Sequence, residues 1–209
     1  MRGVKNDNET TMKVCQLTAV DFTVKHFLLP LIDGMVKQKW SVSIVCSSGI
    51  YTNELKKKGY DIHNIEIPRN LNIFLLTISF FKLFKFFKLN SFDIVHVHTP
   101  VASVVARLAA KFAKVPLVVY TAHGFYFHEN MPSLKYYFYL FVEKVLAYFT
   151  DLLFVQSRED FNTAIKYKFL NEKKIFCIGN GVDVNRFNPK KIKNYAKLKK
   201  ELGLPINSF

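Results

Sequence analysis

Two stretches of sequence decide the fold: FDIVHVHTP at residues 92–100 and LVVYTAHGF at residues 117–125. Each contains apolar, mostly β-branched residues, and in each these are followed by polar residues that include a histidine. The segment between them, residues 101–112, is rich in alanine and valine and predicts a helix. Fully apolar strands that alternate with helices indicate a parallel sheet covered on both faces.

The same alternation extends along most of the chain. The strands are predicted at residues 14–17, 41–46, 61–67, 93–98, 117–122, 152–156 and 175–178, and the helices at 26–39, 53–58, 71–89, 101–112, 132–149 and 157–167. This order predicts an α/β fold of the Rossmann-like, doubly wound type, with a mostly parallel sheet and helices on both faces. Ligands of such folds bind at the carboxyl ends of the strands, so the chemistry is expected there.

Three regions of different composition divide the sequence. Residues 1–11 are polar, lack the apolar stretch of a signal peptide, and are expected to be a disordered leader. Residues 12–188 carry the strand and helix pattern of one domain. Residues 189–209 are rich in lysine and predict a basic linker with a short helix, leading towards a second domain that the sequence does not contain.

The chain is strongly basic, with 30 lysines and arginines against 16 acidic residues and a formal net charge of +14. Its positive charge suits an anionic membrane surface or a phosphorylated ligand. Nucleic acid is not an expected partner, because no recognition motif is present and the lysines are dispersed over a helix and the tail. The three cysteines, Cys15, Cys46 and Cys177, are widely separated and predict buried thiols in a reducing compartment rather than disulfides.

Polar residues follow three of the predicted strands. His98 and Thr99 end the fourth strand, His123, Gly124 and Phe125 follow the fifth, and Asn180 and Gly181 follow the last. Because parallel strands end at the same edge of a sheet, these residues are expected to form one wall of a cleft.

These motifs, in this order and spacing, resemble the N-terminal domain of family-4 retaining glycosyltransferases of the bacterial capsule, exopolysaccharide and O-antigen type. The resemblance covers roughly residues 12–208 and rests on FDIVHVHT, YTAHGF and NGVD followed by Phe187 and Pro189. It implies one half of the GT-B architecture, in which two Rossmann-like domains face each other. The N-terminal domain binds the acceptor, and the missing C-terminal domain binds the nucleotide-sugar.

The resemblance assigns His123 as the catalytic residue, facing the transferred sugar and the leaving group. Its imidazole could donate a hydrogen bond to an oxygen that gains charge. His98, Thr99, Gly124, Phe125, Asn180 and Gly181 are the expected substrate-binding residues. The structural alternatives are a histidine that caps the strand end through the backbone, and a simple turn at Asn180-Gly181.

Neither a metal site nor a cofactor is expected. His96 and His98 share one face of a strand and could supply two metal ligands, but no matching third and fourth ligand is evident. His96 is instead expected to be a hydrogen-bonded core histidine. The sequence has no Gly-x-Gly-x-x-Gly motif, which argues against a nicotinamide or flavin dehydrogenase, and the nucleotide-sugar is expected to be a substrate.

Residues 71–89, LNIFLLTISFFKLFKFFKL, predict an amphipathic helix. At about 100° per residue, Lys82, Lys85 and Lys88 fall on one side, opposite an apolar face formed by Phe80, Leu83, Phe84 and Phe87. A basic helix rich in phenylalanine is typical of membrane interfaces, so Phe81 and the three lysines are the expected membrane contacts. The alternative is an ordinary helix that covers the sheet.

The sequence therefore predicts part of an enzyme that transfers a sugar from a nucleotide-sugar to a polyprenyl-diphosphate-linked saccharide. It would act from the cytoplasm, at the inner face of the cell membrane, and this part would be inactive alone. The alternative is a non-catalytic, membrane-recruiting subunit that binds the acceptor, while a separate chain supplies the donor-binding domain.

Overall fold

The computed structural model describes residues 11–69, 72–185, 187–188 and 195–205. By their contacts, the residues divide into two units, Met1–Ile178 and Gly179–Phe209. The predicted leader lies outside the described residues except for Thr11, as do residues 189–194 and 206–209 of the predicted linker.

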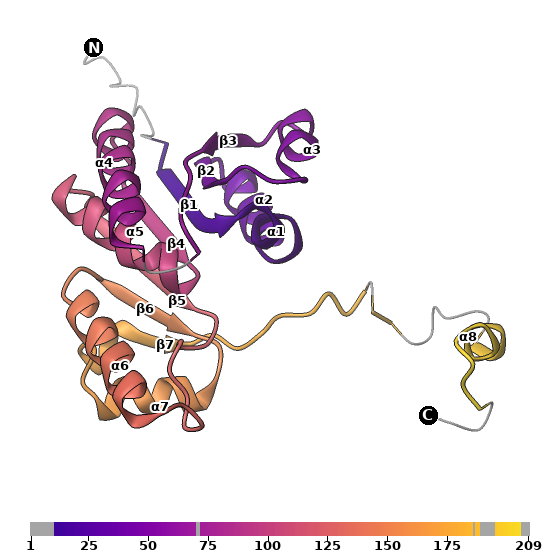
Figure 1. Cartoon of the computed structure of the whole chain (residues 1–209). Helices are drawn as coiled ribbons and strands as arrows, with labels where there is room; N and C mark the ends of the chain where they lie inside the picture. Colours follow the sequence, from indigo (N-terminus) through magenta and orange to yellow (C-terminus); the bar gives the residue numbers. More distant parts are fainter. Residues whose placement is uncertain (1–10, 70–71, 186, 189–194, 206–209) are drawn as a thin grey trace, which may run out of the picture. The chain divides into compact units, whose positions relative to one another are not determined.

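The first unit contains a parallel sheet of seven strands in the order β3-β2-β1-β4-β5-β6-β7 (Figure 1). The strands are β1 (Lys13–Val20), β2 (Ser41–Ser47), β3 (Asp61–Asn64), β4 (Ile94–His98), β5 (Leu117–Ala122), β6 (Leu152–Val155) and β7 (Ile175–Cys177). All neighbouring pairs are parallel, which confirms the predicted sheet. The chain order changes direction between β1 and β4, and this switch point is where doubly wound folds bind ligands.

Helices cover both faces of this sheet. They are α1 (Asp21–Thr23), η1 (Val24–Leu28), α2 (Leu29–Lys37), α3 (Thr52–Lys57), α4 (Ile73–Asn90), α5 (Pro100–Phe112), α6 (Ser133–Ala147), α7 (Arg158–Lys166) and the short η2 (Glu172–Lys174). Ile44 and Cys46 of β2 pack with the helices between β1 and β3, whereas Val45 packs with α4 and α5. Since side chains alternate along a strand, the two groups of helices lie on opposite faces.

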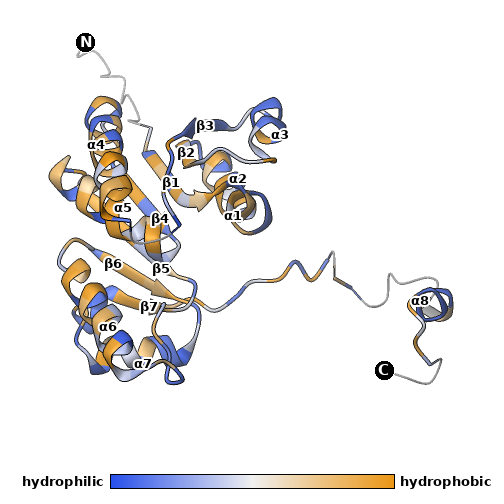
Figure 2. Cartoon of the chain, viewed as in Figure 1, coloured by the Kyte–Doolittle hydropathy of each residue, from blue (hydrophilic) through white to orange (hydrophobic). Residues whose placement is uncertain are grey.

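The core follows from the apolar strands, which Figure 2 shows as hydrophobic in β5 and β6. Val95 and Val97 of β4 and Val118 of β5 are buried beneath α4 and α5. Tyr120, Ala122, Leu153 and Val155 are buried beneath α6 and α7. Burial of each such side chain stabilises the fold by about 1.5–3 kcal/mol. Because these apolar side chains take one face of β4 and β5, the polar residues of the two strands lie on the other face.

Three element boundaries differ from the sequence prediction by three residues or more. The first strand, predicted at residues 14–17, continues to Val20. The predicted helix at residues 26–39 begins earlier, at Asp21, and passes through a π-helical turn at Val24–Leu28. Pro30 has no amide N–H for the carbonyl of His26, so regular α-helical bonding is interrupted at this point. The third strand ends at Asn64 rather than residue 67, because the amide of Ile67 donates to Ser47 Oγ instead of to the backbone of β2.

The second unit contains one described helix, α8 (Tyr195–Glu201). Three of its seven residues are lysines, and Figure 2 shows this helix as hydrophilic. A short basic helix was predicted in this part of the sequence.

Candidate active site

The carboxyl ends of β4 and β5 place two histidines in contact. The strands pair with His98 opposite Thr121, so His123 follows β5 close to the end of β4. His98 Nδ1 and His123 Nε2 are 3.1 Å apart. His98 is 2% exposed, whereas His123 is exposed at the surface of the unit. The pair thus joins a buried ring to one that a ligand can reach.

Gln16 of β1 connects the two histidines of β4. It lies opposite His96 in the parallel register and is fully buried. Its amide Nε2 is 3.3 Å from His96 Nδ1, and its Oε1 is 2.9 Å from His98 Nε2. On the far side, His96 Nε2 is 2.7 Å from Thr121 Oγ1. We call Gln16, His96, His98, Thr121 and His123 the histidine network.

With the Gln16 amide oriented as in the structure, one arrangement of protons satisfies these groups when the buried rings are neutral. The Gln16 amide can only donate through nitrogen and accept through oxygen. His96 therefore accepts at Nδ1 and donates from Nε2 to Thr121, while His98 donates from Nε2 to Gln16. His98 Nδ1 is then an acceptor, so His123 donates its Nε2–H inward to His98. The Nδ1 atom of a neutral His123 is then the acceptor nitrogen of this ring, which also hydrogen-bonds to the Gln156 side chain.

Burial keeps this network uncharged. Desolvation lowers the pKa of His96 to about 3, with a smaller contribution from His123. Desolvation, followed by repulsion from His96 and His123, holds the pKa of His98 well below its usual range. Desolvation also lowers the pKa of His123, although a hydrogen bond with the Gln156 side chain works in the opposite direction. Neutral rings at pH 7 are consistent with the proton arrangement given above.

Thr99 and Gly124 adopt unusual backbone conformations at the two strand ends. Thr99 has φ of 69°, which is rare for a β-branched residue, and its Oγ1 accepts a hydrogen bond from the Ala19 amide at 3.3 Å. This bond ties the residue after β4 to the end of β1. Gly124 has φ of 109°, a conformation that favours glycine. Strain of this kind persists where surrounding contacts fix it and is common at functional sites.

Phe125 lies against the core rather than towards the histidine network. Its ring stacks on Phe127 at 5.2 Å and contacts the edge of Phe169 at 5.4 Å. Its amide donates to Asp160 Oδ1 at 3.5 Å, near the N-terminus of α7. Its side chain thus anchors the loop that carries His123.

Asn180 and Gly181 belong to the second unit. Both are exposed, and the backbone from Gly179 to Asp183 forms no regular turn, contrary to the turn expected at Asn180-Gly181. Gly179 instead takes the left-handed conformation, with φ of 66°. The turn lies further on, where the Asp183 carboxylate accepts from the Asn185 amide at 2.9 Å. Asp183 therefore caps a turn, as its residue type suggests.

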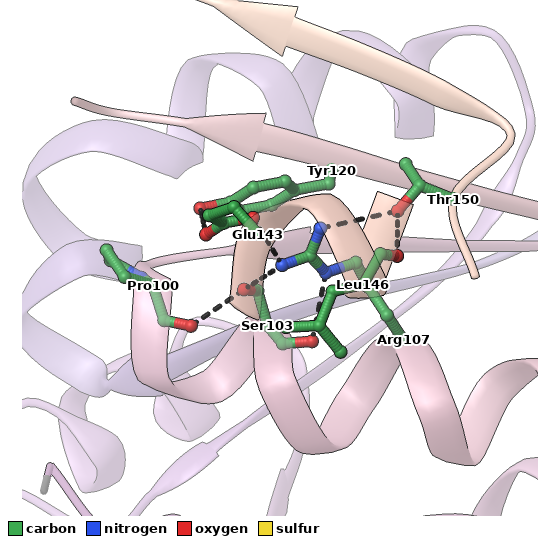
Figure 3. Close-up of polar contacts among 7 residues, drawn as sticks. All are labelled: Pro100, Ser103, Arg107, Tyr120, Glu143, Leu146 and Thr150. Atoms are coloured by element: carbon green, nitrogen blue, oxygen red, sulfur yellow. Dashed lines mark hydrogen bonds and ion pairs between the residues drawn. The ribbon is translucent and has the colours of Figure 1, made fainter. Parts of the chain in front are cut away.

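The other face of the sheet carries a buried polar cluster that sequence analysis missed (Figure 3). Arg107 of α5 is 1% exposed and donates to Glu143 Oε2 of α6 at 2.8 Å and to Ser103 Oγ at 2.9 Å. Its guanidinium also lies 4.1 Å from the centre of the Tyr120 ring. The cluster joins α5, α6 and β5 beneath the surface. A single arginine within a small-residue helix was the only sequence signal.

The predicted apolar face of α4 packs against the core, and the residues expected to contact a membrane lie on its exposed side. Leu83 and Phe87 are buried, with Phe80 and Phe84 packed against them. Phe81 is 62% exposed, and Lys82, Lys85 and Lys88 are also exposed. Within the described residues, no helix is both long enough and apolar enough to cross a bilayer.

Metal ligands do not gather in the part of the chain that the structure describes: no group of three histidine, cysteine, aspartate or glutamate side chains could hold an ion there. The three histidines of the network use their ring nitrogens on one another, on Gln16 and on Thr121. Gln16 and Thr121 were missed by the sequence analysis. A glutamine in an otherwise apolar strand is the signal that could have found Gln16.

The fold and this strand-edge site define a Rossmann-like α/β domain, a fold whose ligands bind at the carboxyl ends of the strands. A family model described as "Glycosyltransferase Family 4" matches residues 24–186. The chain belongs to this family.

Known proteins support this assignment. The chain is 31% identical, over 87% of its length and 50% of the relative's, to the UDP-Gal:alpha-D-GlcNAc-diphosphoundecaprenol alpha-1,3-galactosyltransferase of Escherichia coli. It is 28% identical to the capsular polysaccharide biosynthesis glycosyltransferase CapM of Staphylococcus aureus, over 81% and 47% of the two chains. A crystal structure of a glycosyltransferase from Rickettsia africae superposes with a TM-score of 0.69 at 20% identity, over 95% and 51%. The chain thus spans about half the length of the relatives it matches.

Proposed function

We propose that the chain forms the acceptor-side half of a retaining glycosyltransferase in bacterial surface polysaccharide synthesis. The donor would be a nucleotide-sugar and the acceptor a polyprenyl-diphosphate-linked saccharide, and no cofactor would take part. The observation that carries the proposal is the family match over residues 24–186 together with the histidine network at the carboxyl edge of the sheet. The Escherichia coli relative, whose name specifies both kinds of substrate, supports the substrate classes.

His123 is the proposed catalytic residue of this site. Because its Nε2–H is directed to His98, a neutral His123 has its acceptor at Nδ1, and a hydroxyl of the transferred sugar would compete for this ring with the Gln156 side chain, which also hydrogen-bonds to it. Donation to the leaving oxygen requires a second proton on the ring. His98 then acts as a positioning residue that holds the ring of His123, and Gly124 permits close approach of the backbone to the ligand. Thr99, Phe125, Asn180 and Gly181 remain proposed substrate-binding residues.

Transfer is proposed to require a donor-binding domain, supplied by the same protein or by a separate chain. The experiment combines the 209-residue chain with such a domain and follows the transfer of labelled sugar to a polyprenyl-diphosphate saccharide. The chain alone should be inactive. His123→Ala should lower kcat by about 10²–10⁴-fold, whereas His128→Ala, an exposed histidine in the same loop, should leave kcat unchanged. Transfer by the chain alone, or an unchanged kcat for His123→Ala, would contradict the proposal.

The pH dependence separates the two roles of His123. If the neutral ring accepts from a sugar hydroxyl, kcat should fall as acid protonates His123, whose pKa lies below its usual range. If the protonated ring donates to the leaving oxygen, kcat should rise in the same range. We expect the first result.

The chain is also proposed to bind the inner face of the cell membrane through the exposed side of α4. This side is apolar in its first half, at Ile73, Phe74 and Ile78, and basic in its second half. A phenylalanine at the centre and lysines at one end suit the boundary between lipid tails and anionic headgroups.

Flotation with anionic liposomes tests this contact. The wild-type chain should float, and salt should release part of it. Changing Lys82, Lys85 and Lys88 to glutamate should abolish flotation, because each lysine contributes about 1 kcal/mol near anionic lipid. The matched control makes the same change to glutamate at Lys37, Lys56 and Lys57, which are exposed on the opposite layer of helices. If both triple variants float equally, the α4 surface is not the membrane contact.

A further inference from the structure

A pocket opens at the same sheet edge as the histidine network, between the N-terminal part of α5 and the middle of α6. It encloses about 180 Å³. Its walls are mainly the apolar side chains of Val101 and Val104 on α5 and Val142 on α6. Whole ligands usually occupy about 300–1,000 Å³, so this pocket has room for one end of a larger molecule.

Two tyrosines and an arginine also line the pocket. Tyr126 and Tyr139 line the pocket, with their ring centres 4.5 Å apart. Arg69, from the segment between β3 and α4, also lines it and is exposed. Among the described ion pairs Arg69 has no acidic partner. Its five donors are therefore available to an anion. A planar guanidinium matches the geometry of phosphate and carboxylate groups, and phosphate is the one that the proposed acceptor carries.

Glu143 also lines the pocket, but its charge is already balanced. Its two carboxylate oxygens face Arg107 at 2.8 Å and the hydroxyl of Tyr120 at 3.4 Å. The net positive charge of the pocket lining thus comes from Arg69. The positive end of α5, which begins at Pro100 beside the pocket, adds to it.

The loop after β5 connects this pocket with the proposed catalytic histidine. His123 contacts His98 on one side of the sheet edge, and Tyr126, three residues later, lines the pocket on the side of α5 and α6. Gly124, with φ of 109°, lies between them and allows the chain to change direction. A ligand in the pocket would therefore contact the loop that carries His123.

We propose that this pocket binds the first apolar unit of an isoprenoid phosphate, with Arg69 on the phosphate. The apolar walls and small volume fit one branched hydrocarbon unit. The remaining chain could run along the exposed apolar side chains of the flanking helices, Phe74 of α4 and Phe138 and Phe141 of α6. The inference rests on the proposed function, in that it places the lipid end of the acceptor in a particular pocket.

The test measures direct binding of three probes to the 209-residue chain by titration calorimetry. The probes are farnesyl diphosphate, inorganic diphosphate and farnesol. Farnesyl diphosphate should bind at least tenfold more tightly than either fragment, because only it fills the pocket and reaches Arg69. If inorganic diphosphate bound as tightly as farnesyl diphosphate, the pocket would be an anion site only. If farnesol bound as tightly as farnesyl diphosphate, Arg69 would have no role in binding. Either result would overturn the proposal.

Two variants and one control locate the binding. Arg69→Ala should weaken farnesyl diphosphate binding about 10–100-fold, the effect of losing a charge-assisted hydrogen bond. Val104→Phe, which fills the pocket from a half-buried position, should weaken it to a similar extent. Arg158→Ala, an exposed arginine on α7, is the matched control and should bind as wild type. Wild-type binding by Arg69→Ala, a surface variant expected to fold, would overturn the assignment.

Binding by the isolated chain does not depend on catalysis. If farnesyl diphosphate binds as predicted while no sugar transfer is found with any donor domain, the pocket stands and the proposed enzymatic function fails. If transfer occurs but Arg69→Ala and Val104→Phe leave both binding and the KM for acceptor unchanged, the pocket fails and the function stands.

Discussion

The two faces of the central strands carry polar clusters of opposite character. The histidine network, on one face, consists of neutral groups and ends at an exposed ring. The Arg107–Glu143 cluster, on the other face, is charged and has its partners inside the protein (Figure 3). A neutral hydrogen-bonded network that ends at an exposed ring can exchange a protein partner for a ligand. A buried ion pair whose partners are all inside the protein mainly holds helices together. The difference suggests a functional role for the first cluster and a structural role for the second.

The largest effect is expected when the buried ion pair is broken. Glu143→Gln leaves the Arg107 guanidinium without a counter-charge at 1% exposure. We expect a loss of about 3–5 kcal/mol in the free energy of unfolding, as for other buried pairs with one partner removed. Urea denaturation followed by circular dichroism measures this loss.

A matched acid on the surface provides the control for this comparison. Glu129→Gln, at an exposed position, should change the free energy of unfolding by less than about 0.5 kcal/mol. If Glu143→Gln were as stable as this control, the Arg107–Glu143 cluster would not be the structural element proposed here.

The next effect is the response of stability to acid. His96 has a pKa of about 3 in the folded protein and about 6.5 when unfolded, and the pKa of His98 is lowered as well. Between these values the unfolded chain holds protons that the folded chain lacks, so acid favours unfolding. The stabilising contribution of His96 is complete above pH 6.5 and declines as the pH falls towards 3, and the lowered pKa of His98 acts in the same direction.

Unfolding titrations at several pH values check this prediction. His96→Asn should reduce the slope of stability against pH between 6.5 and 4, and the exposed His128→Asn should not. A slope that His96→Asn and His98→Asn leave unchanged would show that other groups produce the acid response.

The smallest expected effect concerns the order of protons in the histidine network. Gln16→Leu removes the amide that separates the roles of His96 and His98, leaving both rings short of a partner. The cost should be about 1–3 kcal/mol of unfolding free energy. The sharper readout is the ring nitrogens in ¹⁵N NMR of the 209-residue chain. In wild type, His123 should carry its proton on Nε2, and this preference should weaken in Gln16→Leu.

A conservative change separates positioning from packing. Gln16→Asn keeps the amide but shortens the side chain, so it should lose the ordering of tautomers while costing no more stability than Gln16→Leu. If both variants retain the Nε2 proton on His123, Gln16 does not set the protonation of the network.

Sequence reasoning predicted the architecture well because it depends on local patterns. The apolar runs around Val95 and Val118 can be satisfied only by burial on both faces, and so they predicted parallel strands. The same reasoning missed the π-helical turn at Val24–Leu28 and placed a turn at Asn180-Gly181, where the backbone is irregular. Both depend on which hydrogen-bond partners the rest of the chain supplies.

By itself, the sequence determined the order of strands and helices, the parallel sheet and the family to which the chain belongs, since residue periodicity and motif spacing are properties of the linear chain. Only the tertiary structure decided that Gln16 lies between His96 and His98, that Arg107 meets Glu143, and that Arg69 reaches the pocket beside Tyr126. These contacts join residues far apart in the chain. Their pairing is set by sheet register and helix packing, which no local pattern encodes.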